Sequence, residues 1–114
     1  MRNDIYEKLI NVARSQNLIS YDDLNKQLNL GFDFTLPPDR NLIGHWLGEI
    51  SEHEVRAGRH MLSAVVVRKE GEGFGDPGKG FYECARDLGV YTGSDDLDFW
   101  AKEVKWLRDY WSSN

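Results

Sequence analysis

Apolar residues recur every three or four positions along several stretches of the chain, which is the spacing of one face of an α-helix. This spacing predicts a helix over residues 3–16 and a shorter one after Ser20, whose hydroxyl is placed to cap the first-turn amides. The strongest periodicity lies in a third helix over about residues 39–54, which we expect Asp39 to cap. Because two prolines stand directly before Asp39, we expect extended chain there rather than helix.

The second half of the chain begins with a different pattern. Residues 61–67 are rich in β-branched side chains and have the length of a buried strand. A glycine-rich loop follows over residues 70–80, where the missing side chains give the backbone unusual freedom. Helical spacing then returns over residues 81–88, which Gly89 ends, and in a last helix that we expect Ser94 to cap.

This order of two helices, a third helix, a strand and a flexible loop is that of winged helix-turn-helix domains. We therefore predict a single α+β domain over residues 1–114 that is mostly helical and contains a small sheet. Its winged-helix core occupies residues 1–80, with the glycine-rich loop as the wing. The C-terminal helices of residues 81–114 are expected to pack against that core.

Two short motifs resemble a known family. Residues 19–24 read Ile-Ser-Tyr-Asp-Asp-Leu, and residues 40–44 read Arg-Asn-Leu-Ile-Gly. Over about residues 4–50 the chain resembles the DNA-binding domain of the alkyltransferase and alkyltransferase-like proteins, which implies DNA binding through the third helix. That family needs a Pro-Cys-His-Arg motif for alkyl transfer, whereas residues 59–64 here read Arg-His-Met-Leu-Ser-Ala. The single cysteine, Cys84, lies on a predicted helix as a small buried side chain, so alkyl transfer is not expected.

The charge distribution restricts where nucleic acid can bind. The 114 residues carry 19 acidic and 14 basic side chains, a net charge of −5, which argues against a broadly basic nucleic-acid coat. Only residues 55–80 have a positive balance, of +2. One cysteine excludes an internal disulfide, and no apolar run has the length of a signal peptide or a membrane span. We expect a cytoplasmic protein with no cofactor, metal ion or membrane partner.

A nucleic-acid-binding regulator is the function that this pattern favours. The third helix presents polar residues opposite its apolar stripe, and basic residues near the loop are placed to neutralise phosphates. The candidate residues for nucleic-acid contact are Arg40, Asn41, His45, Arg59, Arg68, Lys69 and Lys79. Glu49, Glu52 and Glu54 on the same helix repel phosphate, which leaves open that the candidates are ordinary solvated positions.

A second candidate function is a small acidic inhibitor, immunity-type or regulatory protein that covers a basic surface of a protein partner. The aromatic residues expected to contact such a partner are Phe74, Trp106 and Tyr110. Phe74 stands in the glycine-rich loop, and the other two fall partly off the apolar stripe of the last helix. The sequence leaves the choice between these two functions, and the oligomeric state, open.

An enzyme is the third alternative and has the least support. Residues 73–79 match glycine-rich phosphate-binding patterns, but Gly80 stands where a P-loop needs Ser or Thr. His45, His53 and His60 lack the H-E-x-x-H spacing of a helical metal site. We therefore assign no catalytic and no metal-binding residue.

Overall fold

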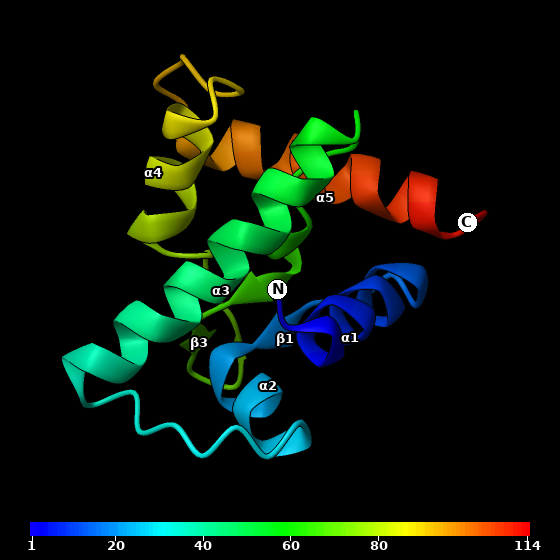
Figure 1. The fold of residues 1–114 in the computed structure, drawn as a ribbon. Helices are drawn as coiled ribbons and strands as arrows, with labels where there is room; N and C mark the ends of the chain where they lie inside the picture. The colour runs from blue at the N-terminus through cyan, green and yellow to red at the C-terminus, as the bar shows by residue number, and fades with distance from the viewer.

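Five α-helices make up most of the chain in the computed structural model, which describes all 114 residues (Figure 1). The helices are α1 (Asn3–Arg14), α2 (Tyr21–Gln27), α3 (Pro37–Arg56), α4 (Lys79–Asp87) and α5 (Asp96–Trp111). None of them combines the length and the apolar composition needed to cross a bilayer. The mostly helical architecture predicted from the apolar spacing is confirmed.

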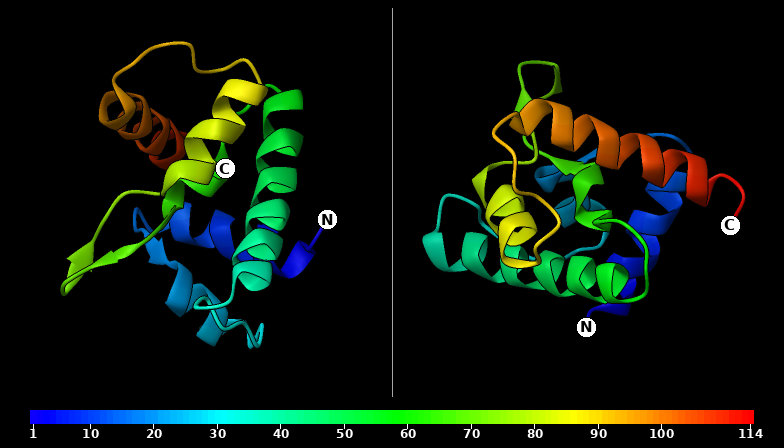
Figure 2. Two further views of the ribbon diagram at one scale, coloured as in Figure 1. Left: turned by 90° about the vertical axis from the view of Figure 1, so that its left-hand side faces the viewer. Right: turned by 90° about the horizontal axis from the view of Figure 1, so that it is seen from above.

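Two pairs of two-residue strands complete an α+β fold. β1 (Ile19–Ser20) pairs in parallel with β2 (Val66–Val67). β3 (Lys69–Glu70) pairs antiparallel with β4 (Gly73–Phe74), so the glycine-rich loop contains a β-hairpin that projects from the body of the molecule (Figure 2). The two pairs are separate sheets, and together they form only a small part of the fold.

The segment of residues 61–67 lies at the centre of the molecule, and all its side chains are buried. Its first part is a 3₁₀ helix, η1 (Leu62–Val65), that packs against α1, α3 and α5. Figure 2 shows this segment between α3 and α5. The prediction of one continuous strand was wrong, since only Val66 and Val67 pair with another strand. An apolar run of this length does not distinguish a buried strand from a buried helical turn.

Side-chain caps mark the starts of α2 and α5. Ser20 Oγ accepts a hydrogen bond from the Asp23 amide at 3.0 Å, as predicted. α5 is capped by Asp95, whose carboxylate accepts from the Asp98 amide at 3.1 Å, and not by Ser94. Because Ser and Asp cap helices equally well, adjacent Ser and Asp locate a helix start only to within one residue.

Helix α3 begins two residues earlier than predicted. Pro37 and Pro38 occupy its first two positions, where a missing amide costs nothing because first-turn amides have no acceptor inside the helix. Asp39 is not the cap, and its carboxylate accepts instead from the Asp33 amide at 2.8 Å. Gly58 follows the other end of α3 with a φ of 80°.

Candidate nucleic-acid interface

A groove with a volume of about 470 Å³ opens between the N-terminal ends of α2 and α3 and the segment that joins the hairpin to α4. Asp22 is the one acidic residue in its lining. The lining also includes four basic residues and two aromatic rings, which are Arg40, Arg68, Lys69, Lys79, Tyr21 and Phe34. We call these six residues and the space that they enclose the basic groove. All four basic residues are among those predicted to contact nucleic acid, and the fold brings them together from three separate segments.

Each basic side chain comes from the end of an element. Arg40 lies in the first turn of α3, and its Nη1 donates to the Phe34 carbonyl oxygen at 2.9 Å. Arg68 directly follows β2, Lys69 is the first residue of β3, and Lys79 is the first residue of α4. Arg40 has no carboxylate at ion-pair distance, so most of its five N–H donors stay available to a ligand.

The other three basic side chains each have an acidic partner. These pairs are Arg68–Asp76 at 2.9 Å, Lys69–Asp23 at 3.8 Å and Lys79–Glu83 at 3.7 Å between nitrogen and oxygen. All six side chains are exposed. Exposed pairs of this kind contribute about 0–1 kcal/mol each, so a phosphate replaces the carboxylate at small cost.

Hydrogen bonds tie the base of the hairpin to the rest of the molecule. The Arg68 amide donates to the Asp76 carbonyl oxygen at 2.9 Å. The Asp76 carboxylate accepts from the Gly78 amide at 2.8 Å, and the Tyr21 hydroxyl donates to the Pro77 carbonyl oxygen at 2.9 Å. The first two bonds close the base of the hairpin, and the bond from Tyr21 holds that base against α2.

Two aromatic rings form the apolar side of the basic groove. Tyr21 opens α2, and the centroid of its ring lies 6.2 Å from that of Phe34 in an edge-to-face arrangement. Burial raises the pKa of Tyr21 to about 12, so its hydroxyl remains a donor at neutral pH. Asn25 holds the loop that carries Phe34 by hydrogen bonds to both backbone groups of Phe32. The sequence pattern did not identify either ring as a site residue, because only folding places them side by side.

Three residues predicted to contact nucleic acid lie outside the basic groove. Asn41 borders a neighbouring cavity between α3 and α4. His45 lies on the outer face of α3, where its Nε2 is 2.9 Å from Glu49 Oε1. Arg59 lies beyond the C-terminal end of α3, next to a buried carboxylate. The predicted set therefore divides into four residues that converge and three that do not.

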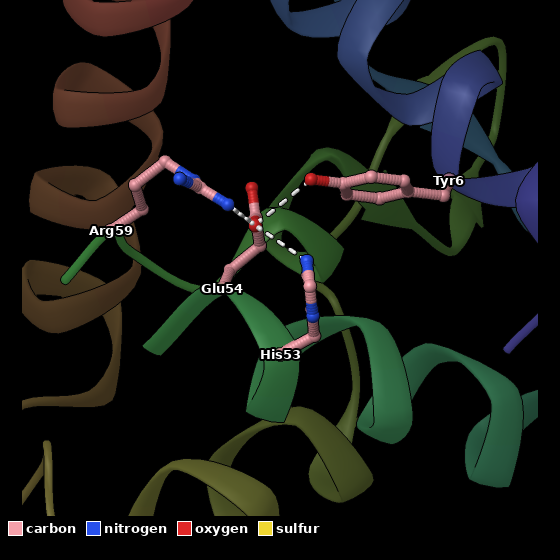
Figure 3. A network of polar contacts seen from close by, with 4 residues as sticks. All are labelled: Tyr6, His53, Glu54 and Arg59. Carbon is pink, nitrogen blue, oxygen red and sulfur yellow. Dashed lines mark hydrogen bonds and ion pairs between the residues drawn. The ribbon is translucent and has the colours of Figure 1, made fainter. Parts of the chain in front are cut away.

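The buried carboxylate belongs to Glu54, whose side chain has no exposed surface. Figure 3 shows it among its polar partners Tyr6, His53 and Arg59. Its Oε2 accepts hydrogen bonds from Arg59 Nε at 3.0 Å, from Arg59 Nη2 at 2.6 Å and from the Tyr6 hydroxyl at 3.1 Å. His53 Nε2 lies 4.0 Å from the same oxygen. The hydrogen bond to Glu54 raises the pKa of Arg59. Since a buried charge needs a countercharge, the Arg59 guanidinium neutralises the Glu54 carboxylate in the core.

The aromatic residues predicted to contact a protein partner differ in exposure. Phe74 in β4 is 52% exposed. Trp106 and Tyr110 are half-buried and stack on each other at 4.8 Å between centroids, and His60 stacks on Trp106 at 4.2 Å. His60 also pairs with the buried carboxylate of Glu103. Of the three predicted contact residues, Phe74 alone has a largely free ring.

The structure brings no three His, Cys, Asp or Glu side chains together in a group that could hold a metal ion. Cys84 is half-buried on α4, beside Gly48 of α3. Burial, together with the nearby acids Asp87 and Glu52, raises the pKa of its thiol, which keeps the sulfur protonated and a poor nucleophile.

No known protein family, no curated protein and no solved structure matches the chain.

Proposed function

We propose that this protein binds nucleic acid in the basic groove, as a non-enzymatic module of regulatory type. The observation that carries the proposal is the convergence of four basic side chains on one groove of a molecule whose net charge is −5. Lys and Arg clustered on one face are the electrostatic footprint of phosphate contact. The weak acidic partners of three of them, and the free donors of Arg40, leave these groups available to phosphates.

A winged-helix frame gives each part of the groove a role in this proposal. The order α1, β1, α2, α3, β2 and a β-hairpin supports such a frame, with the β3–β4 hairpin as the wing. In it, Arg40 approaches the ligand from the first turn of α3, where its planar guanidinium suits a base edge or a phosphate. Arg68 and Lys69 approach from the base of the wing and neutralise the backbone.

Reversing the charge of Lys79 tests the proposal against a matched control. Lys79 on α4 and Lys102 on α5 have side chains that are 89% and 75% exposed, and each pairs with an acid one helical turn away. We expect Lys79→Glu to weaken the binding of a mixed-sequence oligonucleotide about tenfold at about 0.05 M salt, because phosphate contacts dominate affinity. Lys102→Glu should change it less than about twofold. Fluorescence anisotropy measures both affinities.

Two outcomes of this comparison contradict the proposal. The first is that the unaltered protein binds neither single-stranded nor double-stranded oligonucleotides. The second is that the two variants lose affinity equally, since both reverse one exposed lysine and only Lys79 lies in the basic groove.

The exposed ring of Phe74 favours a second candidate function, in which this acidic protein covers a basic surface of a protein partner. If so, a basic protein should co-purify with the unaltered chain from the source organism and be lost with Phe74→Ala. Oligonucleotide binding should then be absent in both. If the unaltered chain binds oligonucleotides and captures no protein, the result supports nucleic-acid binding in the basic groove and contradicts the second function.

A further inference from the structure

The carboxylates on the outer face of α3 are paired with basic groups, so this face offers no free cation to a DNA duplex. His45 Nε2 is 2.9 Å from Glu49 Oε1, and Arg56 Nη2 is 2.6 Å from Glu52 Oε1. The N-terminal amine lies 3.8 Å from the other oxygen of Glu49. A recognition helix instead presents Lys, Arg or amide side chains to phosphates and base edges. Beyond the turn that contains Arg40, the outer face of α3 therefore lacks unpaired basic side chains that would hold a duplex.

A second face of α3 is covered by α4. Gly48 of α3 lies beside Cys84 of α4, and Figure 2 shows the two helices next to each other. One α-helix with its side chains is about 10–12 Å wide, which nearly fills a B-DNA major groove of about 12 Å. Two packed helices do not fit there, so the face of α3 that α4 covers is not available to a duplex.

The basic groove has the size of a site for one nucleotide. Its volume of about 470 Å³ falls within the range of about 300–1,000 Å³ that is usual for small-ligand sites. Arg68, Lys69 and Lys79 lie on its hairpin and α4 side, and the rings of Tyr21 and Phe34 supply its apolar part. A positive groove that also contains aromatic rings is the arrangement with which proteins bind single strands.

We infer that the basic groove takes single-stranded nucleic acid, with backbone phosphates against Arg68 and Lys79 and one unpaired base against Phe34. This inference rests on the proposed function and specifies its substrate class. Unpaired bases have free faces for stacking, whereas neighbouring bases cover those faces in a duplex. DNA and RNA strands share this chemistry, and the experiment below separates them.

One labelled sequence of about 12 nucleotides tests the inference in three forms. These are single-stranded DNA, the same strand annealed to its complement, and single-stranded RNA of the same sequence. We expect at least one single strand to bind about tenfold more tightly than the duplex at the same salt concentration, as measured by fluorescence anisotropy. Tighter binding of RNA than of DNA would show that the groove contacts a 2′-hydroxyl. Tighter binding of DNA would show that the groove has no room for that hydroxyl.

Two phenylalanine substitutions test where the base lies. Phe34 lines the basic groove, whereas the neighbouring ring of Phe32, 5.6 Å away, packs on Trp46 at 5.3 Å and lies outside it. We expect Phe34→Leu to weaken single-strand binding about tenfold and to leave duplex binding unchanged, because leucine offers no flat face for stacking. Phe32→Leu should change neither affinity. Circular dichroism melting verifies that both variants are folded.

The outcomes separate this inference from the proposed function. Duplex binding as tight as single-strand binding overturns the inference and leaves nucleic-acid binding in place. Binding of none of the three forms overturns the proposed function itself. Equal effects of Phe34→Leu and Phe32→Leu on single-strand binding overturn the position assigned to the base.

Discussion

The carboxylate of Glu54 depends on Arg59, which supplies two of the three hydrogen bonds to its Oε2, while its Oε1 has no partner. We expect Arg59→Ala to lower the free energy of unfolding by about 2–4 kcal/mol, because the charge then stays buried without its countercharge. The control is Arg56→Ala, which removes a 78% exposed cation whose ion pair with Glu52 contributes about 0–1 kcal/mol. Urea unfolding measures both losses, and equal losses would contradict this role of Arg59.

The phenol of Tyr21 makes stability depend on alkaline pH. Burial raises its pKa from an ordinary value of 10.0 to about 12. The folded state thus holds the phenol proton more tightly than the unfolded chain does. The protonated phenol of Tyr21 therefore contributes fully to stability below about pH 10, and this contribution is lost as the pH rises to about 12. We expect Tyr21→Phe to reduce this alkaline fall in the free energy of unfolding. At neutral pH it should cost about 1 kcal/mol for the lost bond to Pro77.

Chemical denaturation of Tyr21→Phe and the unaltered protein at several pH values between 8 and about 12 checks this prediction. Burial also raises the pKa of Tyr82 to about 12. Tyr82 should therefore keep part of the decrease in unfolding free energy at alkaline pH in the variant. A fall of the same size in both proteins would assign it to groups other than Tyr21.

Residue type alone predicted the charges of the basic groove but not its rings. Arg68, Lys69 and Lys79 belong to the one net-positive stretch of the sequence, so counting charges along the chain finds them. Arg59 belongs to the same stretch, but it pairs with the buried carboxylate of Glu54. The sequence does not show that this glutamate is buried, so it does not predict the pairing. Phe34 borders the groove only because its loop folds back beside α2, which depends on contacts far apart in the chain.

At the scale of elements, α3 and its end contain two glycines whose replacement should act in opposite directions. Gly58 has a φ of 80°, which L side chains rarely adopt, whereas Gly44 lies within the helix with open space where a Cβ would be. We expect Gly58→Ala to lower the free energy of unfolding by about 1 kcal/mol and Gly44→Ala to raise it by about 0.5–1 kcal/mol. Urea unfolding gives both values, and the same sign in both variants would be inconsistent with the structure.

Elements with strong local signals were predicted close to their observed bounds. Helical spacing alone marks α1, whereas α2 and α5 also have a capping side chain and α4 is followed by a stop glycine, Gly89. The start of α3 was misplaced because prolines that end one helix are equally suited to begin another. Residues 61–67 were misassigned because their conformation is decided by the three helices around them, which a local pattern does not contain.

On the scale of the whole molecule, acidic groups that contribute to the net charge on the far side lie well beyond the Debye length from the basic groove. The molecule extends over 32 × 30 × 30 Å, whereas the Debye length is about 8 Å at an ionic strength of about 0.15 M. Acidic groups on the far side are then largely screened from a phosphate in the groove. The local balance of charges, rather than the total of −5, therefore decides whether a nucleic acid binds.

Because only the charges near the groove act on the ligand, the number of phosphates bound there sets the salt dependence of single-strand binding. Each phosphate neutralised on a single strand contributes about −0.7 to the slope of log K against log salt, so phosphate contacts with Arg68, Lys69 and Lys79 imply a slope of about −2. Lys69→Gln should reduce the magnitude of that slope by about 0.7, because Lys69 lies in the groove. Lys105→Gln, at an exposed lysine of α5, removes the same charge and should leave the slope unchanged. Anisotropy titrations between about 0.05 and 0.3 M salt measure these slopes. A slope near zero, or equal reductions in the two variants, would show that phosphates are not neutralised in the basic groove.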